Sequence, residues 1–429
     1  MRRALLLLGM GSVVTPSVCR AEPVLPEPST VDDPWTARDA YSERYPEGLQ
    51  AAGFVQAQAA WNQLSEDQLL ARSRPANQDR FSVRRGRVNL SYGWEYAAAA
   101  LELDASTEQS VRVRTAEATL LYRSESDPSH EPPLLALSLG VSDLPVGWEL
   151  AESTRERLLL ERSLGSLALF PRESDVGARG SFSYGPFRLA VSLVNGTDSA
   201  DEWAERNAHK DLLGRVGIDS RGMSSRMRAT GGVSFAVGEG FHAGTDEVKD
   251  SIQWIDDNRD GLVQPTEVIG VPGRTATPSR NFDRWCFGLD LGLHLRTQLG
   301  ESSANAELLV ASNFDRGYAV ADPVIDGVDA RELAFATSLE HRLMGYGAVG
   351  VRLAFYDPNA DLIESRRGQL LPHDQRVWVL SPVLAIQPWT NVRLSAQYDW
   401  VRDSSARDAR GVPTDAANDQ FTLRLQVGS

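Results

Sequence analysis

The chain has 429 residues, of which 42% are hydrophobic and 24% charged, and its formal net charge at pH 7 is −14. This negative charge excludes nucleic acid as a partner, because a phosphate backbone demands a basic protein face. No run of 18 apolar residues follows residue 21, which excludes transmembrane helices.

Residues 1–21, "MRRALLLLGMGSVVTPSVCRA", are laid out like a secretory signal peptide, with two arginines, an apolar core and small residues before Glu22. We expect cleavage after Ala21. The alternative, a membrane anchor, is disfavoured because the apolar run is too short to span a bilayer. A polar periplasmic lead-in, residues 22–50, follows. The exported chain keeps a single cysteine, Cys286, so it cannot form an internal disulfide.

From residue 51 to residue 429 one theme repeats: segments of roughly ten residues alternate apolar and polar positions between Gly, Asp, Asn and Pro clusters. In the clearest segment, "WCFGLDLGLHL", every second residue from Trp285 to Leu295 is large and apolar. Sixteen strands are predicted, starting near residues 53, 82, 94, 111, 133, 175, 187, 211, 227, 284, 304, 332, 346, 376, 391 and 419. The alternation breaks in those near 53, 111, 211 and 376.

Such strands fit either a soluble β-sandwich or an outer-membrane barrel. Three features favour the barrel: strands long enough to cross a bilayer, small or charged residues on the polar face, and aromatic residues such as Trp94, Trp285 and Tyr356 near strand ends. Short turns also alternate with long segments. The predicted fold is therefore an all-β transmembrane antiparallel barrel of about sixteen strands, with short periplasmic turns, long extracellular loops and an aqueous bore.

Alternation also assigns charged residues to the bore. The arginines predicted to line the pore are Arg85, Arg87, Arg112, Arg114, Arg179, Arg188, Arg296, Arg352, Arg393 and Arg424. The acids on the same faces are Glu102, Asp104, Asp290, Glu307, Glu340 and Asp399. A basic wall in a narrow pore favours anions. In the alternative interpretation, these residues pair with one another across strands and merely solvate the wall.

The longest predicted loop, residues 239–281, contains the spacing of a calcium-binding loop in "DDNRDGLVQPTE". Glycine occupies the sixth of its twelve positions, and the predicted ligands are Asp256, Asn258, Asp260, the backbone carbonyl of Leu262, and Glu267. An EF-hand needs a helix on each side, whereas both flanks here have the strand pattern. We expect a structural calcium ion that orders this extracellular loop, with the hairpin itself holding its two ends.

No nucleophile–base pair, Gly-rich phosphate cradle or Cys/His metal cluster stands out, so we do not expect an enzyme. Two alternatives to a membrane channel stay open. One is a secreted or surface calcium-dependent binding protein built as a β-sandwich, which would stay soluble without detergent. The other is a barrel closed by its long loops that acts as a receptor or scaffold.

Four segments in order, "FSVRRGRVNLSYGWEYAAAALELD", "VRVRTAEATLLYR", "PLLALSLGVSDLPVGWELAESTRERLLLERSL" and "FPRESDVGARGSFSYGPFRLAVSLVNGT", resemble the N-terminal half of the phosphate-selective porin family. The likeness covers residues 54–197 and includes the Arg-Arg-x-Arg run of Arg84, Arg85 and Arg87. It implies a trimeric sixteen-stranded channel in the bacterial outer membrane that passes small anions such as phosphate and other small hydrophilic solutes.

The chain departs from this family in two places. Lys210 and Lys249 are the only lysines, although the family's anion channels guide phosphate with lysine as well as arginine. The sequence also ends in Ser429 rather than in the terminal aromatic residue of many outer-membrane proteins.

Overall fold

The computed structural model describes residues 47–64, 78–107, 111–123, 132–196, 207–220, 226–343, 347–361, 363–366, 369–372, 375–407 and 412–428. They all belong to one compact unit, residues 35–429. The expected signal peptide and nearly all of the expected lead-in lie outside the described residues. The first strand begins at Gly48, three residues before the predicted start of the barrel at residue 51.

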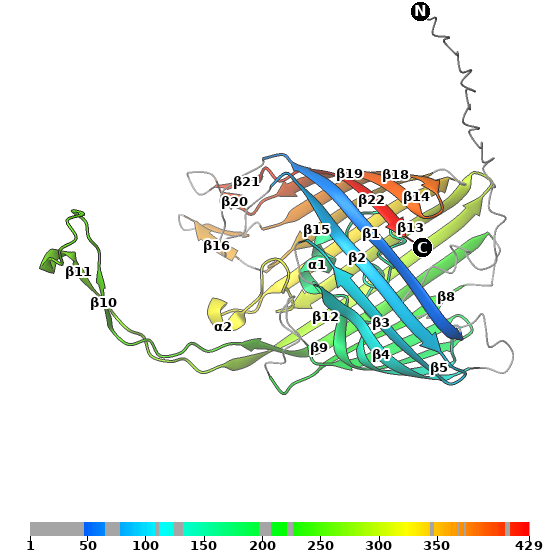
Figure 1. Ribbon diagram of the computed structural model, residues 1–429, viewed down its shortest axis with the longest axis horizontal. Helices are drawn as coiled ribbons and strands as arrows, with labels where there is room; N and C mark the ends of the chain where they lie inside the picture. The colour runs from blue at the N-terminus through cyan, green and yellow to red at the C-terminus, as the bar shows by residue number, and fades with distance from the viewer. Residues whose placement is uncertain are drawn as a thin grey trace, which may run out of the picture. The chain divides into compact units, whose positions relative to one another are not determined.

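Sixteen antiparallel strands close into one barrel, as predicted. In order around the ring they are β1 (Gly48–Asn62), β2 (Arg80–Gly93), β3 (Ala97–Ala105), β4 (Arg112–Tyr122), β5 (Leu135–Asp143), β6 (Ser174–Tyr184), β7 (Phe187–Val194), β8 (Asp211–Asp219), β9 (Met227–His242), β12 (Arg280–Thr297), β13 (Gly300–Ser312), β14 (Arg331–Leu343), β15 (Gly347–Asp357), β18 (Val377–Trp389), β19 (Val392–Asp403) and β22 (Gln420–Gly428). β1 pairs with β22 and closes the ring (Figure 1). The sandwich alternative is wrong.

Most of the large apolar residues on the strands face away from the bore. On β12 the side chains of Leu289, Leu291 and Leu293 are 48%, 59% and 39% exposed, whereas their neighbours Gly288 and Asp290 are buried. Period-two alternation places the two sets on opposite faces of the wall. The apolar set therefore forms the outer surface of the barrel, as a membrane barrel requires and a compact soluble core does not.

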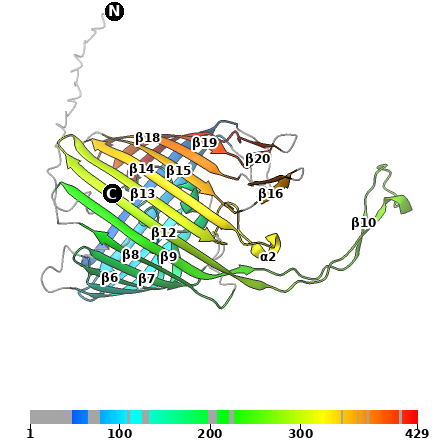
Figure 2. The ribbon, with the colours of Figure 1, turned by 180° about the vertical axis from the view of Figure 1, so that it is seen from behind.

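The connections differ in length at the two ends of the barrel. At the end that we call the turn end, β6 and β7 are joined by a two-residue turn with Gly185 at φ +52°, and β12 and β13 by an equally short one. At the opposite, loop end lie the long connections, some with strands of their own: β10 (Ser251–Trp254) with β11 (Val268–Val271), β16 (Ile363–Arg366) with β17 (Gln369–Pro372), and β20 (Ala406–Arg407) with β21 (Pro413–Thr414). Figure 2 shows the same barrel from behind.

Helical structure is sparse among the described residues. It consists of α1 (Leu164–Leu169), α2 (Pro323–Asp326) and the single 3₁₀ turn η3 (Pro265–Glu267). None of these helices is long and apolar enough to cross a membrane.

Candidate functional site: a lumen divided by one loop

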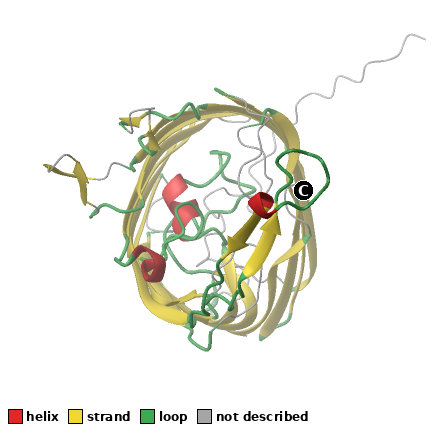
Figure 3. Cartoon of the chain, turned by 90° about the vertical axis from the view of Figure 1, so that its left-hand side faces the viewer, coloured by secondary structure: helices red, strands yellow, loops and turns green. Residues whose placement is uncertain are grey.

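The connection between β5 and β6, residues 144–173, lies inside the barrel; we call it the lumen loop. Glu161 of this loop contacts Arg85 on β2, and the backbone amides of Trp148 and Glu149 donate to Glu307 on β13 at 2.6 and 2.8 Å. Strands β2 and β13 are far apart around the ring, so a segment that reaches both must cross the bore. Figure 3 shows helix and loop within the ring of strands.

One side of the lumen loop is apolar and packs on the wall. Its buried residues Leu144, Val146, Leu150, Ala168, Leu169 and Phe170 form one cluster with inward residues of β7, β8, β9, β12, β13, β14 and β15. Helix α1 lies so close to β14 that a Cβ atom on Gly165 would come within 2.3 Å of the Cβ of Ala334. Tyr356, expected near the membrane interface, is instead buried in this cluster. Half of the bore is therefore filled by a dry core.

The other side of the lumen loop is charged and meets the arginines. Glu161 accepts ion pairs from Arg85 on β2 at 2.7 Å and from Arg424 on β22 at 2.6 Å. A third guanidinium, from Arg84, lies 2.9 Å away. Burial alone would raise the pKa of Glu161, but the three cations hold that pKa well below its usual range. Glu161 is therefore ionised and ties the loop to the wall.

Arg84 reaches Glu161 because β2 carries a β-bulge there. Gln56 of β1 pairs with Arg85, and Ala57 pairs with Val83, so Arg84 has no partner on β1. A bulge sets two residues against one and interrupts the alternation of faces. Strict alternation from Arg85 and Arg87 directs Arg84 outward, which is why sequence reasoning missed it as a site residue.

A second carboxylate of the lumen loop, that of Glu173, contacts another group of arginines. Arg114 of β4 lies 3.0 Å from it and Arg87 of β2 lies 3.4 Å from it. Burial raises the pKa of Glu173, but these arginines, with Arg162, lower it well below its usual range. Arg114 is itself the extra residue of a bulge between β3 and β4, which explains the broken alternation of the strand predicted near residue 111.

The structure brings six of the ten predicted arginines to the lumen loop. Besides the four described above, Arg352 donates to the carbonyl of Glu161 at 2.6 Å, and Arg393 donates to the carbonyls of Arg155 and Glu156 at 2.8 and 3.3 Å. The other four lie elsewhere: Arg112 pairs with Asp104, Arg179 donates to the carbonyl of Asp143, Arg188 donates to carbonyls of the β6–β7 turn, and the exposed Arg296 pairs with Glu301 near the β12–β13 turn.

Sequence reasoning also missed the acids of the lumen loop and Arg342. Glu149 accepts hydrogen bonds from the amide and hydroxyl of Ser163 and lies 3.4 Å from Arg352. Arg342 of β14 donates to the carbonyl of Glu156 at 2.9 Å. The alternation of strand residues gives no information about residues in a loop. The clearest sequence signal for Glu161 is the "ERS" segment from Glu161 to Ser163, which lies in the third of the four segments that resemble the phosphate-selective porin family.

Beside the charged side of the lumen loop, a space of about 510 Å³ remains open. Polar residues of β1, β19 and β22 line it, including Gln58, Gln397 and Thr422, together with Arg84 and Arg424. This space lies opposite the dry core. The bore is thus divided into a packed half and a wet half.

The predicted calcium ligands lie at the tip of the β10–β11 hairpin, and the two strands pair from Ser251–Val271 to Trp254–Val268. Asp256 accepts hydrogen bonds from the amides of Asp260 and Gly261 at 3.2 and 3.0 Å, and Gly261 has φ +73°. Glu267 accepts a hydrogen bond from the indole of Trp254 at 3.2 Å.

The remaining predicted ligands belong to the same turn: Asn258 accepts from the amide of Asp260 at 2.9 Å, and the amide of Leu262 donates to Asp260 at 2.7 Å. Within the described parts of the chain, no three His, Cys, Asp or Glu side chains are gathered closely enough to hold a metal ion. The carboxylates as they lie here accept from backbone, side-chain amide and indole N–H groups.

No known protein family matches this sequence in a scan of family models, and no curated protein sequence matches it either. Solved structures do. The anion-selective porin from Comamonas acidovorans superposes with a TM-score of 0.51 over 89% of this chain and 99% of its own, at 10% identity. OprB of Pseudomonas putida superposes with a TM-score of 0.51 over 89% of this chain and 94% of its own, also at 10% identity.

The outer-membrane channel DcaP of Acinetobacter baumannii gives a TM-score of 0.50 over 91% of this chain and 99% of its own, at 11% identity. At such identities the likeness concerns the fold alone. The chain therefore has the sixteen-stranded barrel fold of outer-membrane porins.

Proposed function

We propose that this protein is an outer-membrane porin through which small hydrophilic solutes diffuse passively. The observation that carries the proposal is the wet half of the bore: a space of about 510 Å³, with many amide, hydroxyl and charged side chains in its wall, inside a barrel whose outer surface is apolar. An apolar belt outside and a polar lumen inside suit a channel in a lipid bilayer.

We further propose that the channel favours small anions, phosphate among them. Three guanidinium groups, those of Arg84, Arg85 and Arg424, surround the single carboxylate of Glu161. Arg87 and Arg114, by contrast, pair both with Glu173 and with the wall acids Asp104 and Glu102. Arg342 and Arg393 add two guanidinium groups that donate to the carbonyl oxygen of Glu156 in the loop. An excess of fixed positive charge in a narrow pore raises the local concentration of anions.

Planar-bilayer recording tests both proposals. The purified protein should conduct, and the reversal potential in chloride and phosphate gradients should show anion preference. Cation preference would overturn the anion proposal. Absence of conductance in every salt would overturn the porin proposal and favour a closed barrel acting as a receptor or scaffold.

A homotrimer is also proposed. Strands β1, β3 and β4 carry a run of small residues on part of their outward faces, at Ala51, Gly53, Ala57, Ala97, Ala99, Ala116 and Ala118, beside larger residues such as Leu101 and Leu120. The outward face of β12 carries Phe287, Leu289 and Leu291. Small residues let protein surfaces approach closely within a membrane, where burial from water supplies no driving force. We call the part of β1, β3 and β4 that carries these small residues the flat sector and propose that it contacts neighbouring copies, whereas β12 faces lipid.

Calcium at the tip of the β10–β11 hairpin stays a proposal. The paired strands supply the closed base that helices supply in an EF-hand, and Gly261 occupies the left-handed turn that the loop needs. The carboxylates do not surround a common point, so binding would require the turn to close, with Asp256, Asp260 and Glu267 exchanging N–H partners for the ion.

A further inference from the structure

Carboxamide side chains line the wet half along three neighbouring strands of its wall, β1, β22 and β19. The registers of these strands place their inward residues in rows across the wall. In the row toward the loop end, Gln420 stands between Asn62 and Asp399. One row deeper, toward the turn end, Thr422 stands beside Gln397. All five residues line the open space.

These groups match the hydroxyl groups of a solute. A hydroxyl group both donates and accepts, as a carboxamide does, whereas an ionised carboxylate only accepts. Gln420 donates to Asn62 through Nε2 at 3.0 Å, which uses one of its two N–H groups. Gln58, which also lines the space, accepts from Arg424 at 3.0 Å, and its Nε2 group has no hydrogen-bond partner among the described residues. Both glutamines are only partly buried, so the wall offers carboxamide groups to a solute.

The charges of the space change along its length. At its deeper part, two of the three guanidinium groups around Glu161, those of Arg84 and Arg424, line the space. The side chain of Arg84 is 27% exposed and meets Glu161 through Nε and Nη2, which leaves Nη1 without a partner in the described parts of the chain. Toward the loop end the charged residues that line the space are Asp399, Asp403 and Arg80. A negative group is therefore favoured at the deeper part, and hydroxyl groups are matched nearer the loop end.

The rest of the wall is aliphatic. The side chains that form it are Leu160, Leu164, Leu167, Val377, Val379 and Val401. A saturated ring with several hydroxyl groups has C–H faces that pack on such side chains and polar edges that reach the carboxamides. The volume of about 510 Å³ is enough for a six-membered ring with its substituents.

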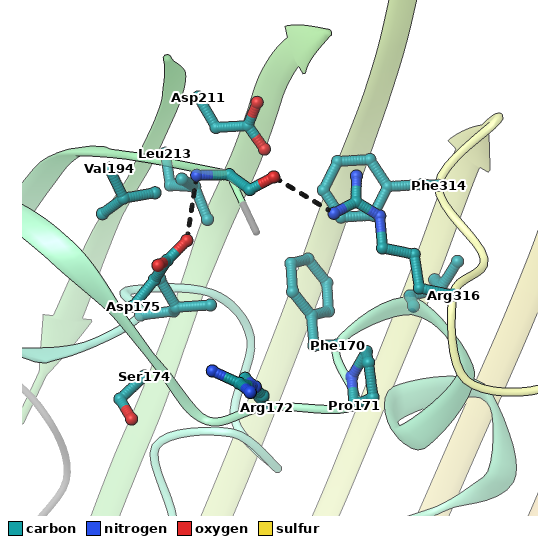
Figure 4. Close-up of a pocket in the computed structure, with 13 residues that line it drawn as sticks. Phe170, Pro171, Arg172, Ser174, Asp175, Val194, Asp211, Leu213, Phe314 and Arg316 are labelled. Atoms are coloured by element: carbon teal, nitrogen blue, oxygen red, sulfur yellow. Dashed lines mark hydrogen bonds between the residues drawn. The ribbon is translucent and has the colours of Figure 1, made fainter. Parts of the chain in front are cut away.

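A smaller pocket at the loop end, drawn in Figure 4, does not compete for such a solute. Its volume is about 50 Å³, which suits ordered water rather than a ring. Charged groups of this pocket are joined through Gly196, whose amide donates to Asp175 at 2.9 Å and whose carbonyl accepts from Arg316 at 3.5 Å.

We propose that the wet half selects sugar acids, six-membered rings that carry one carboxylate and several hydroxyl groups. The carboxylate lies at Arg84 and Arg424, and the hydroxyl groups exchange hydrogen bonds with Gln58 and Gln420. An inorganic anion meets only the arginines, and a neutral sugar only the carboxamides. This inference rests on the proposed porin function and names a solute class for it.

Glucuronate is the probe. Cyclohexanecarboxylate is the matched anion without hydroxyl groups, and glucose is the matched ring without charge. Added to a bilayer that holds the channel in KCl, glucuronate should reduce the current reversibly and with saturation, at a half-blocking concentration about tenfold below that of either control. Such a ratio corresponds to one additional hydrogen bond or ion contact.

Two variants separate the contributions of charge and hydroxyl groups. Gln420→Leu should raise the half-blocking concentration of glucuronate about fivefold, the loss of one neutral hydrogen bond, and leave that of cyclohexanecarboxylate unchanged. Arg84→Gln should raise both concentrations and leave that of glucose unchanged. The control is Gln387→Leu, an exposed carboxamide near the β18–β19 turn that does not line the space, and it should keep the wild-type values.

The KCl current recorded before any solute is added separates the two proposals. If the wild-type protein carries no KCl current, the porin function fails. If it does conduct, the solute class is overturned by the absence of a glucuronate block, by a control solute that blocks as well as glucuronate, or by a glucuronate block unchanged in Gln420→Leu. Should Gln420→Leu fail to insert, Thr422→Val together with the three-solute comparison on the wild-type channel decides.

Discussion

Arg85 on the barrel wall and Glu161 on the lumen loop lie 2.7 Å apart, from Nη2 to Oε2, and join the loop to the strand across the bore. Arg84 and Arg424 complete the group around the same carboxylate. Under the proposed porin function a solute in the wet half passes these charges, so the balance between them bears on both selectivity and stability.

Neutralising Glu161 should make the channel more anion-selective. Glu161→Gln removes one negative charge and leaves the three guanidinium groups in place. One unit charge about 8 Å from an ion in water changes its energy by about 0.5 kcal/mol, or about twofold in permeability ratio. Reversal potentials in a KCl gradient measure this ratio. The control is Glu301→Gln, which breaks the exposed pair with Arg296 near the turn end and should change the permeability ratio less. An equal change in both variants would contradict the placement of Glu161 beside the solute path.

Acid should loosen the lumen loop through the same carboxylates. The folded-state pKa of Glu161 and that of Glu173 both lie well below the usual range. Their ion pairs therefore stabilise the fold fully above the unfolded pKa of about 4.3, and the contribution is lost as pH falls toward the folded value. Thermal unfolding in detergent at pH 6, 5, 4 and 3 checks this. Glu161→Gln should lose less stability than wild type below pH 4, and an identical acid loss in both proteins would rule the mechanism out.

A methyl group at residue 165 should destabilise the packed half of the bore. Gly165→Ala places its Cβ 2.3 Å from the Cβ of Ala334, so α1 or β14 must shift. Overpacking of this kind costs about 1–3 kcal/mol. Gly180→Ala on the outer face of β6, where a Cβ meets nothing within 4 Å, should stay within about 0.5 kcal/mol of wild type. Urea unfolding of the two variants side by side decides; equal stabilities would contradict the close approach.

Bulk on the flat sector should prevent trimer formation. Ala99→Trp on β3 puts a large ring where the proposed interface needs a flat surface, whereas Leu291→Trp on β12 faces lipid and should be tolerated. Light scattering after size-exclusion chromatography in detergent gives the molar mass of each. Trimers that survive Ala99→Trp but are lost in Leu291→Trp would place the interface on the other side of the barrel.

Terbium can report on the proposed calcium turn. The indole of Trp254 donates to Glu267, so excitation of this tryptophan should sensitise a lanthanide bound there. Emission should saturate, and added calcium should displace it. Glu267→Gln should weaken binding about tenfold, because the twelfth position supplies the bidentate carboxylate. Glu247→Gln, an exposed acid before β10, should leave the titration unchanged. No sensitised emission from the wild-type protein would remove the calcium proposal.

Much of the barrel could be predicted, because alternation reports which face of a strand meets an apolar medium. Leu289 and Leu291 face outward as their spacing indicates, and sixteen strands occur near the predicted starts. The inside was less predictable. Arg84 turns inward only because β1 and β2 are out of register by one residue there, and register is a property of the pair rather than of either strand.

The lumen loop could not be placed from sequence for a similar reason. Its apolar residues resemble those of any buried segment, and whether they pack outside or inside the wall depends on the gap left by small residues such as Ala334 and Ala336 on β14. The same holds for the calcium residues: their spacing is that of a binding loop, yet spacing does not fix where the oxygens of Asp260 and Glu267 point.

The two sides of the bore also differ in which substitutions they tolerate. Residues against the dry core, such as Gly165 and Ala334, are constrained by volume, because any change there disturbs how the loop is seated. Residues along the open side, such as Gln58 and Thr422, line the open space, so under the proposed function substitutions there alter the surface that a solute meets. A lineage could thus change what it imports by substitutions on one wall while the opposite wall keeps the barrel intact.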